Sequence, residues 1–426
     1  MKITHIHIER FRGFQNEDFE VGSLLTAIAG QNGTQKSTLL GIITQTFTLK
    51  TEDSMRVEKP LCGGSYISAF KDKFRLSPTF DKPKGHEWTI SFDAGMDDFT
   101  VESIKRTGDP NVRFWKKGAR QEGDGYISFP TIFLSLKRLV PVAEEAKIIT
   151  DDTLLTQEEL NEFKQLHNKI LIAQTPISSA TTITSKNKQS IGVSTELYDW
   201  NQNSMGQDNL GKIILALFSF KRLHDKYPRQ YKGGILAIDE MDATMYPASQ
   251  VELLKVLRKY ASKLNLQILF TTHSMSLLKA MDDLVQEVTK KEETANQAKI
   301  LYLKKVDDKI AIKQGVNFKG IQLDLNVVAE GNNRKKNRIT AYTEDKENIL
   351  FVKAILKSKA FVLDFVDVTL PCSTLMELVT KRVPAFIYPY SIVILDGDVR
   401  MNKNDLRKIN NADNILILPG NKSPER

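Results

Sequence analysis

The sequence has 426 residues but only two cysteines, Cys62 and Cys372, and no long apolar run. The cysteines are far apart and lack metal-ligand spacing, so a reduced, cytoplasmic setting fits them best. No apolar stretch approaches the roughly 20 residues that a bilayer-spanning helix needs, and the first residues carry no signal-peptide pattern. Internal repeats and zinc-ligand clusters are also lacking. We therefore expect a globular protein without membrane contact.

Composition bounds the size and the partners of the protein. With 41% hydrophobic and 26% charged residues, the chain can form two or three domains of about 150 residues, each with its own core. The net charge of +8 permits contact with nucleic acid. Because many soluble proteins are mildly basic, this charge is only weak support for such a partner.

Residues 30–38, Gly-Gln-Asn-Gly-Thr-Gln-Lys-Ser-Thr, form the motif around which the chain is organised. They follow the apolar run 24–29 and precede the apolar residues 39–43, a pattern typical of strand, tight loop and helix. Such a loop binds phosphate through backbone N–H groups and the helix N-terminus, while a lysine reaches the terminal phosphates. Lys36 and Ser37 match that lysine and the hydroxyl that binds Mg²⁺. The motif predicts a nucleotide site.

One position departs from the general pattern G-x-x-x-x-G-K-[ST], because Gln35 replaces the second glycine. A side chain there limits how closely the backbone approaches a phosphate, whereas Asn32-Gly33 offers a flexible point earlier in the loop. Arg12, one strand earlier, could contact phosphate or be a plain surface residue. The candidate ATP-binding residues of this region are Arg12, Asn32, Gly33, Gln35, Lys36, Ser37 and Thr38.

Two further apolar strands end in polar residues. Residues 234–238 run into Asp239 and Glu240, and residues 264–272 run into His273. The carboxyl ends of strands form the ligand-binding edge of a doubly wound sheet. Asp239 would hold Mg²⁺ through its water shell, Glu240 would orient or deprotonate an attacking water, and His273 would contact the γ-phosphate. The alternatives are an acidic turn and a structural histidine.

Between the phosphate loop and these strands, the residue pattern changes twice. Residues 52–130 contain short strands separated by Gly, Pro and Asp, which predicts an inserted antiparallel sheet. Within residues 151–195, a charged helix over 151–168 precedes a Ser- and Thr-rich loop or mobile segment over 174–190. Ser204 and Gly206 stand before a predicted helix, where they either cap it or present a hydroxyl and N–H groups to phosphate.

The inserted region also carries a basic hairpin with aromatic residues. It could touch nucleic acid, although a solvated sheet face is the more common meaning of such a pattern. The residues concerned are Lys105, Arg106, Arg113, Phe114, Trp115, Lys116, Lys117 and Arg120.

The order of the motifs resembles the ATP-binding-cassette ATPase head. The matching residues are 30–38, Ser204-Met205-Gly206-Gln207, Asp239-Glu240 and His273. Phe11-Arg12-Gly13-Phe14 resembles the chromosome-maintenance and DNA-repair branch of these ATPases. The resemblance implies that two heads sandwich ATP, with Lys36 and Ser37 from one head and Ser204 and Gly206 from the other. It places Asp242 at the dimer interface, and Met205 departs from the family's glycine.

A basic break over 331–338 predicts a domain boundary, after which a second set of strand ends follows. Residues 339–343 run into Glu344, and residues 391–395 run into Asp396-Gly397-Asp398. Because residues two apart in a strand face the same way, both aspartates and Glu344 predict an oxygen-rich pocket for Mg²⁺ or Mn²⁺. Such a pocket can activate water against a phosphodiester.

This second pattern resembles the Toprim domain of OLD-family (overcoming lysogenisation defect) ATP-dependent nucleases. Glu344, Asp396 and Asp398 match its metal-binding acids, and Lys422 and Glu425 match a following segment. Asp345 and Asn348 depart from the family's Gly and acid, which could weaken one metal site. Family members usually continue beyond the point where this chain ends, so we expect an incomplete Toprim domain.

The sequence therefore predicts an α/β protein with an ABC-type ATPase head over 1–330 and a Rossmann-like Toprim domain over 339–426. We expect an ATP-regulated, metal-dependent DNA endonuclease that forms a homodimer or higher oligomer, with a protein or RNA partner left open. The resemblance implies a role in anti-phage defence. A DNA-clamping ATPase without nuclease activity and a sensor that holds a separate effector are the alternatives.

Some residues have more than one predicted role. The predicted catalytic residues are Glu240, Glu344, Asp396, Asp398 and Lys422. The predicted metal ligands are Ser37, Asp239, Glu344, Asp396 and Asp398. The predicted cofactors are ATP and Mg²⁺, with Mn²⁺ as an alternative ion at the second site.

Overall fold

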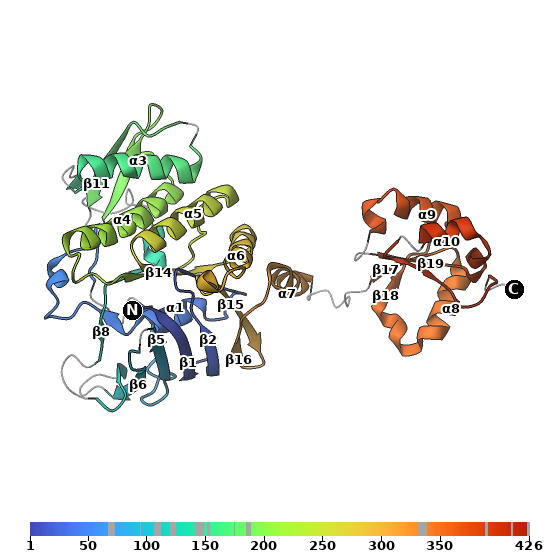
Figure 1. The fold of residues 1–426 in the computed structure, drawn as a ribbon, viewed down its shortest axis with the longest axis horizontal. Helices are drawn as coiled ribbons and strands as arrows, with labels where there is room; N and C mark the ends of the chain where they lie inside the picture. Colours follow the sequence, from blue (N-terminus) through green and yellow to red (C-terminus); the bar gives the residue numbers. More distant parts are fainter. Residues whose placement is uncertain are drawn as a thin grey trace. The chain divides into compact units, whose positions relative to one another are not determined.

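The computed structural model describes residues 1–66, 73–93, 95–105, 112–119, 125–140, 149–150, 154–173, 175–184, 189–330, 339–387, 391–409 and 412–423. The chain divides into two units, Met1–Leu323 and Asp324–Arg426 (Figure 1). Each unit is built on its own parallel sheet and is described by itself. In the described part of the chain, no helix is long and apolar enough to cross a membrane.

A mainly parallel sheet forms the centre of the first unit. Its strands, in spatial order, are β16 (Lys309–Lys313), β15 (Ala298–Val306), β3 (Leu25–Gly30), β14 (Leu266–Thr272), β13 (Gly234–Ile238) and β9 (Thr131–Leu134). Within this sheet, β16 alone runs antiparallel to its neighbour. Every residue of β3, β13 and β14 is buried, as expected for apolar strands covered on both faces. The carboxyl ends of the parallel strands therefore meet at one edge.

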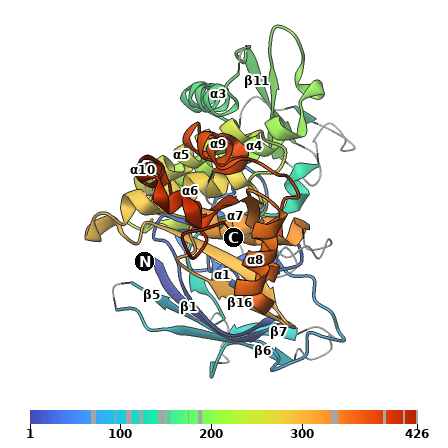
Figure 2. The ribbon, with the colours of Figure 1, turned by 90° about the vertical axis from the view of Figure 1, so that its right-hand side faces the viewer.

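An antiparallel sheet forms a second layer of this unit (Figure 2). Its strands, in spatial order, are β2 (Phe14–Glu20), β1 (Ile3–Phe11), β5 (Glu87–Phe92), β6 (Phe99–Lys105) and β7 (Val112–Lys116). Helix α1 (Lys36–Thr44) packs between the two sheets, since Leu40, Trp88 and Ile28 belong to one core. The antiparallel strands expected within 52–130 thus extend a sheet that the N-terminal hairpin begins. A short pair joins β4 (Phe47–Thr48) to β8 (Ile127–Ser128).

Three helices cover the opposite face of the parallel sheet (Figure 1). They are α4 (Met205–Lys226), α5 (Pro247–Lys263) and α6 (Met275–Val288). Their positions follow from the sequence, because each begins shortly after a polar segment and carries a buried apolar stripe. Ser204 and Ser274 cap α4 and α6 by accepting from backbone N–H groups.

A helix and a small sheet form the outer part of the first unit. Helix α3 (Gln157–Leu171) begins at a capping box of Thr156 and Glu159 and overlaps the charged helix expected over 151–168. The expectation of a loop or mobile segment over 174–190 is wrong for the described residues there, since β11 (Ser179–Thr184) and β12 (Gln189–Ser194) pair antiparallel, with β10 (Ile149–Thr150) at the edge. The reason is a buried apolar face, to which Ile183 and Ile191 contribute.

The second unit has a parallel sheet of β18 (Leu363–Phe365), β17 (Ile339–Thr343), β19 (Ser391–Leu395) and β20 (Ile415–Ile417). Its helices are α8 (Lys346–Leu356), α9 (Cys372–Thr380) and α10 (Lys403–Ile409), while α7 (Phe318–Glu330) runs across the division between the units. Strands β17 and β19 pair directly, with Thr343 opposite Ile394. Glu344 and Asp396 therefore follow the carboxyl ends of neighbouring strands.

Candidate functional site

The loop between β3 and α1 is tight, as the phosphate-loop motif predicts. Gly30 has a φ of 153°, and a Cβ there would lie 2.4 Å from the Leu303 carbonyl oxygen. Gly33 also has a positive φ, 81°, and is exposed with Asn32 at the loop tip. The Thr34 hydroxyl closes the turn by donating to the Gln31 carbonyl at 2.8 Å. The loop therefore has the glycine-dependent backbone of a phosphate cradle.

Gln35 occupies the position where the motif has its second glycine. Its φ of 62° lies in the left-handed region that favours glycine. The Gln35 side chain accepts from the Gly13 N–H at 3.4 Å, and a Cβ on Gly13 would lie 2.7 Å from the Gln35 amide nitrogen. This residue thus joins the phosphate loop to the turn between β1 and β2, a contact that the sequence did not indicate.

The Lys36 ammonium folds back over the loop. Its Nζ donates to the carbonyls of Gly30 and Gln31 at 3.1 and 2.9 Å. Burial lowers the pKa of Lys36, while the Glu240, Asp239 and Asp242 carboxylates act in the opposite direction. The buried Lys36 ammonium lies between the loop and these carboxylates. It can therefore bind a phosphate group, while the carboxylates bind a cation.

Ser37 and Asp239 form the pair expected to hold Mg²⁺. The Ser37 hydroxyl donates to Asp239 Oδ1 at 2.9 Å, and the Thr271 hydroxyl donates to the same oxygen at 2.8 Å. A hydroxyl and a carboxylate are oxygen donors of the kind that Mg²⁺ prefers, with waters and phosphate oxygens as its remaining ligands. The donor set therefore fits Mg²⁺.

Glu240 and His273 lie at the same edge of the sheet. Glu240 has a φ of 49°, and its N–H donates to the Thr271 hydroxyl at 2.6 Å. Burial and the Lys36 ammonium lower the pKa of His273, whereas Asp242, Glu240 and Asp239 act to raise it. The structure thus brings the predicted residues of three strand ends together.

Arg12 lies beside the loop but is already engaged. Its guanidinium pairs with both carboxylate oxygens of Asp81 at 3.0 Å and donates to the Arg75 carbonyl at 2.8 Å. It also lies 3.4 Å from the hydroxyl of Thr38. Arg12, Arg75 and Asp81 border a hollow of about 540 Å³ that Phe80 also lines. The Asp81 pairing is the contact that sequence reasoning missed.

Ser204 and Gly206 open onto a different hollow. Its volume is about 630 Å³, and Tyr198, Gln207 and Tyr246 also line it. Its described lining includes no residue of the phosphate loop. Gly206 is required by packing, since a Cβ there would lie 2.6 Å from the Thr244 carbonyl oxygen. Within one chain, the structure does not bring Ser204 and Gly206 to the residues around Lys36.

Two residues of the site carried no motif in the sequence. Arg138 follows β9 and lies buried behind Glu240, whose carbonyl accepts from its guanidinium at 2.8 Å. Asn209 on α4 accepts from Arg138 Nε at 2.7 Å. The available signal was that residues 131–134 form another parallel strand, whose carboxyl end must reach the same edge.

The second unit brings Glu344 and Asp396 together. The Asp396 N–H donates to Glu344 Oε1 at 2.9 Å. Burial raises the pKa of Glu344, and the Asp396, Asp398 and Asp345 carboxylates add to this shift while the Asp396 N–H opposes it. Such crowding of buried carboxylates is typical of sites that take up a cation or a proton.

The strand argument for Asp398 is wrong. Strand β19 ends at Leu395, and a 3₁₀ turn over Gly397–Met401 follows Asp396. Asp398 is exposed, while Asp396 is buried. The turn breaks the two-residue alternation that would have aimed both carboxylates at one point. Among the described residues, no group of three or more His, Cys, Asp or Glu side chains is arranged to hold a metal ion. The carboxylates of this unit therefore fit a metal only in part.

The segment after β20 lies against this turn. A Cβ on Gly397 would lie 2.6 Å from the Gly420 carbonyl and 3.0 Å from that of Lys422, which places the Lys422 backbone near the acids. Asn348 is fully buried on α8, and neither polar atom of its side-chain amide has a partner among the described residues. Glu425 lies outside the described residues.

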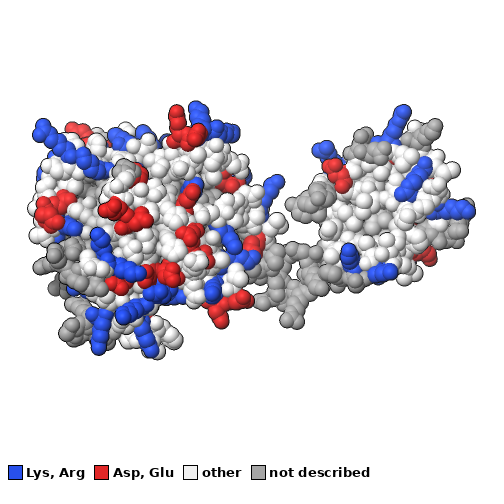
Figure 3. Space-filling model, turned by 60° about the horizontal axis from the view of Figure 1, so that its bottom comes forward, with Lys and Arg blue, Asp and Glu red and all other residues white. Residues whose placement is uncertain are grey.

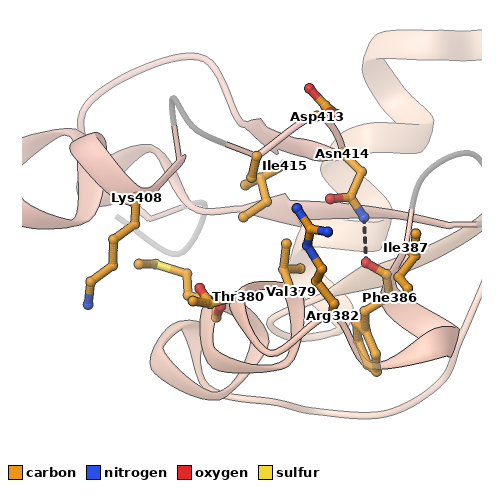
Figure 4. Close-up of a pocket in the computed structure, with 11 residues that line it drawn as sticks. Val379, Thr380, Arg382, Phe386, Ile387, Lys408, Asp413, Asn414 and Ile415 are labelled. Atoms are coloured by element: carbon orange, nitrogen blue, oxygen red, sulfur yellow. Dashed lines mark hydrogen bonds between the residues drawn. The ribbon is translucent and has the colours of Figure 1, made fainter.

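A hollow at the start of β20 lies away from these acids. It has a volume of about 570 Å³, and Arg382, Phe386, Asn414 and Ile415 line it (Figure 4). Asn414 precedes β20, whose strand runs parallel to β19. The hollow thus adjoins the amino ends of the strands, whereas Glu344 and Asp396 follow carboxyl ends.

The basic hairpin of the first unit carries mixed charge. Lys117 pairs with Glu87, and the Arg113 guanidinium stacks 4.1 Å from the centre of the Trp115 ring. Basic and acidic side chains are interspersed on the face of this unit seen in Figure 3. Arg106 and Arg120 lie outside the described residues. The described hairpin therefore resembles a solvated sheet face more than a single-sign nucleic-acid patch.

Comparison with known proteins adds a family match. A family model described as an AAA ATPase domain matches residues 135–278, which include Asp239, Glu240 and His273 but not the phosphate loop. No curated protein matches the sequence at a significant level. This part of the chain is therefore similar to an AAA ATPase domain.

Solved structures with a similar course of the chain include SMC head domains and a recombination mediator protein. The SMC head domain from Thermotoga maritima is 14% identical to this chain, with a TM-score of 0.41. The aligned part covers 74% of this chain and 100% of the SMC head domain. A Smc head domain bound to the C-terminal domain of ScpA, derived from Pyrococcus furiosus, is 13% identical, with a TM-score of 0.41. The aligned part covers 77% of this chain and 99% of that structure's chain. The recombination mediator protein RecF is 12% identical, with a TM-score of 0.38. The aligned part covers 74% of this chain and 98% of the RecF chain.

Proposed function

We propose that the first unit is an ABC-type ATPase head. The observation that carries this proposal is the hydrogen bond from Ser37 to Asp239, which joins the phosphate-loop helix to an acidic strand end. Lys36 lies beside it, and Glu240 follows Asp239 at the same edge. The match of residues 135–278 to an AAA ATPase domain supports the same activity.

The residues at this edge of the sheet would have different roles in ATP hydrolysis. The loop N–H groups and Lys36 would bind the phosphates, while Ser37 and Asp239 would hold Mg²⁺, which neutralises phosphate charge. Glu240 would accept a proton from the water that attacks the γ-phosphorus, and the bond to the β-phosphate oxygen would break. His273 would contact the γ-phosphate from the next strand end.

The second part of the proposal is that two heads share each ATP. Ser204 and Gly206 line a hollow apart from the phosphate loop of their own chain. The phosphate that they contact would therefore belong to ATP bound by a second copy of the chain. A helix N-terminus with a capping serine offers N–H groups and partial positive charge to that phosphate. Asp242 would lie near the contact between the copies.

For the second unit we propose an OLD-type, Toprim-like DNA endonuclease activity. The contact between Glu344 and Asp396 at adjacent strand ends supports it, and Lys422 approaches through its backbone. The activity would be metal-dependent and ATP-regulated, with a role in anti-phage defence suggested by the resemblance. The exposed Asp398 favours the second candidate, an ATPase that clamps DNA or holds a separate effector.

DNA cleavage separates these two candidates. Supercoiled and linear DNA would be incubated with Mg²⁺ or Mn²⁺, with and without ATP, using wild type and the Asp396→Ala/Asp398→Ala double variant. Cleavage that disappears in the double variant supports the nuclease, and the exposed pair Asp364→Ala/Asp367→Ala is the matched control. ATP turnover without cleavage by any of these proteins favours the clamp or sensor.

A further inference from the structure

Arg138 is a buried cation at the ligand-binding edge of the parallel sheet. It lies in a 3₁₀ turn, Leu136–Leu139, that directly follows β9, and its residue surface is 3% exposed. One guanidinium nitrogen donates to the carbonyls of Leu134 and Ser135 at 3.3 and 3.1 Å. These bonds fix the guanidinium to the end of its own strand.

The rest of the guanidinium reaches two other elements. Nε donates to the Asn209 side-chain oxygen at 2.7 Å, and the second terminal nitrogen donates to the Glu240 carbonyl at 2.8 Å. The Asn209 amide nitrogen donates in turn to the Ala243 carbonyl at 2.9 Å. Arg138 and Asn209, which we term the Arg–Asn clamp, therefore hold the segment after β13 at two carbonyls.

That segment needs external support. Glu240 has a φ of 49°, a left-handed conformation that costs free energy in any residue other than glycine and persists only where neighbours enforce it. Its N–H is held by the Thr271 hydroxyl, and its carbonyl is held by Arg138. The direction of the Glu240 side chain is thus set from both ends of the residue.

Arg138 keeps its charge in this position. Burial lowers the pKa of the guanidinium to about 10, and the carboxylates of Asp239, Glu240 and Asp242 act in the opposite direction. At neutral pH the group is protonated and can donate all of these hydrogen bonds. A lysine could not replace it geometrically, because an ammonium lacks the planar fork that spans Asn209 and Glu240.

The clamp also connects to the N-terminal turn of α4. Asn209 is fully buried in that helix, shortly after Ser204 and Gly206. A Cβ on Gly206 would lie 2.6 Å from the Thr244 carbonyl, so the same turn packs directly on the segment after Glu240. Hydrogen bonds through Asn209 and Arg138 therefore connect the N-terminal part of α4 to Glu240.

We infer that Arg138 and Asn209 are positioning residues that orient Glu240 for hydrolysis and couple it to the N-terminal turn of α4. This inference rests on the proposed ATPase function. When the ATP of a second copy occupies that turn, the clamp holds Glu240 in its reactive orientation. Hydrolysis then depends on pairing of heads, although neither clamp residue touches ATP.

Steady-state ATP turnover by the full chain tests the inference. Asn209→Asp keeps the acceptor for Arg138 but removes the donor to Ala243, and Arg138→Lys keeps the charge but removes the fork. We expect kcat to fall by about 10- to 100-fold in each variant. KM for ATP, the Kd from calorimetry and the ATP-dependent dimer fraction from light scattering should change by less than about threefold. The neighbouring exposed Lys137→Met is the matched control.

A second readout separates positioning from folding. Turnover per subunit of wild type should rise with protein concentration as heads pair, whereas Asn209→Asp should form the dimer without this rise. A kcat within threefold of wild type in both clamp variants, or equal losses of kcat, ATP affinity and dimer, would overturn the inference. If Arg138→Lys does not fold, Asn209→Asp decides alone, and if that variant also fails to fold the clamp is structural. Absence of turnover in wild type would instead overturn the proposed ATPase and this inference with it.

Discussion

The Ser37 hydroxyl donates a hydrogen bond to Asp239 at 2.9 Å although 202 positions separate the two residues. The contact exists because β3 and β13 are parallel strands of one sheet and both end at the same edge. Thr271 donates to the same carboxylate oxygen from β14, which lies between those strands. Three strand ends thus fix Asp239 before any ligand binds.

Replacement of Lys36 should remove nucleotide binding. In Lys36→Ala we expect the affinity for ATP, measured by calorimetry, to fall by about 100-fold, because a charge-assisted contact to the phosphates is lost. Lys255→Ala is the control, since Lys255 is exposed on α5. ATP affinity equal to wild type would contradict the phosphate-loop assignment.

Glu240→Gln should separate binding from hydrolysis. The amide keeps the shape of the side chain but cannot accept a proton, so kcat should fall by about 10²- to 10⁴-fold while ATP affinity is kept. The ATP-bound dimer should then accumulate in size-exclusion chromatography. Exposed Glu293→Gln serves as the control, and unchanged turnover would refute the role of Glu240.

Ser204→Arg should block pairing of the heads. The bulky cation would fill the hollow at the N-terminus of α4, which is apart from the phosphate loop of the same chain. ATP affinity of the single head should stay near that of wild type, whereas ATP-dependent dimerisation by light scattering should be lost. Exposed Asn201→Arg should keep both properties. Loss of ATP binding itself would mean that Ser204 acts within its own chain.

Acid should weaken the first unit through Asp81. Burial of Asp81 opposes its ionisation, but hydrogen bonds from Arg12, the Ser77 N–H and His86 lower its pKa to about 2. Because this pKa is below the unfolded value of about 4, the stabilisation is complete above pH 4 and is lost as the pH falls toward 2. It amounts to about 2 kcal/mol.

Urea unfolding between pH 2.5 and 6 checks this expectation. The three tryptophans, Trp88, Trp115 and Trp200, all lie in the first unit, so their fluorescence reports on it alone. The difference in unfolding free energy between wild type and Asp81→Asn should shrink as the pH falls. Exposed Asp97→Asn should differ little from wild type at every pH, and a pH-independent effect of Asp81→Asn would exclude the mechanism.

The sequence predicted those parts of the site that follow from continuous local patterns. Apolar runs ending in Asp239 or His273 indicate parallel strands, and carboxyl ends of parallel strands must meet. Arg138 escaped prediction because its role depends on Asn209 and Glu240, which approach it only in the folded sheet. The strand alternation expected for Asp396 and Asp398 was wrong because a 3₁₀ turn follows β19, and the alternation of apolar and polar residues does not predict that turn.

The spatial order of the central sheet has a consequence for synthesis of the chain. Strand β3, which carries the phosphate loop, has β14 on one side and β15 on the other, and both are made much later. Until residues 298–306 leave the ribosome, β3 lacks one of its neighbours and presents an unpaired edge. The first unit therefore cannot fold stepwise from its N-terminus, and the loop over residues 30–38 gains its final neighbours only after nearly the whole unit has been translated.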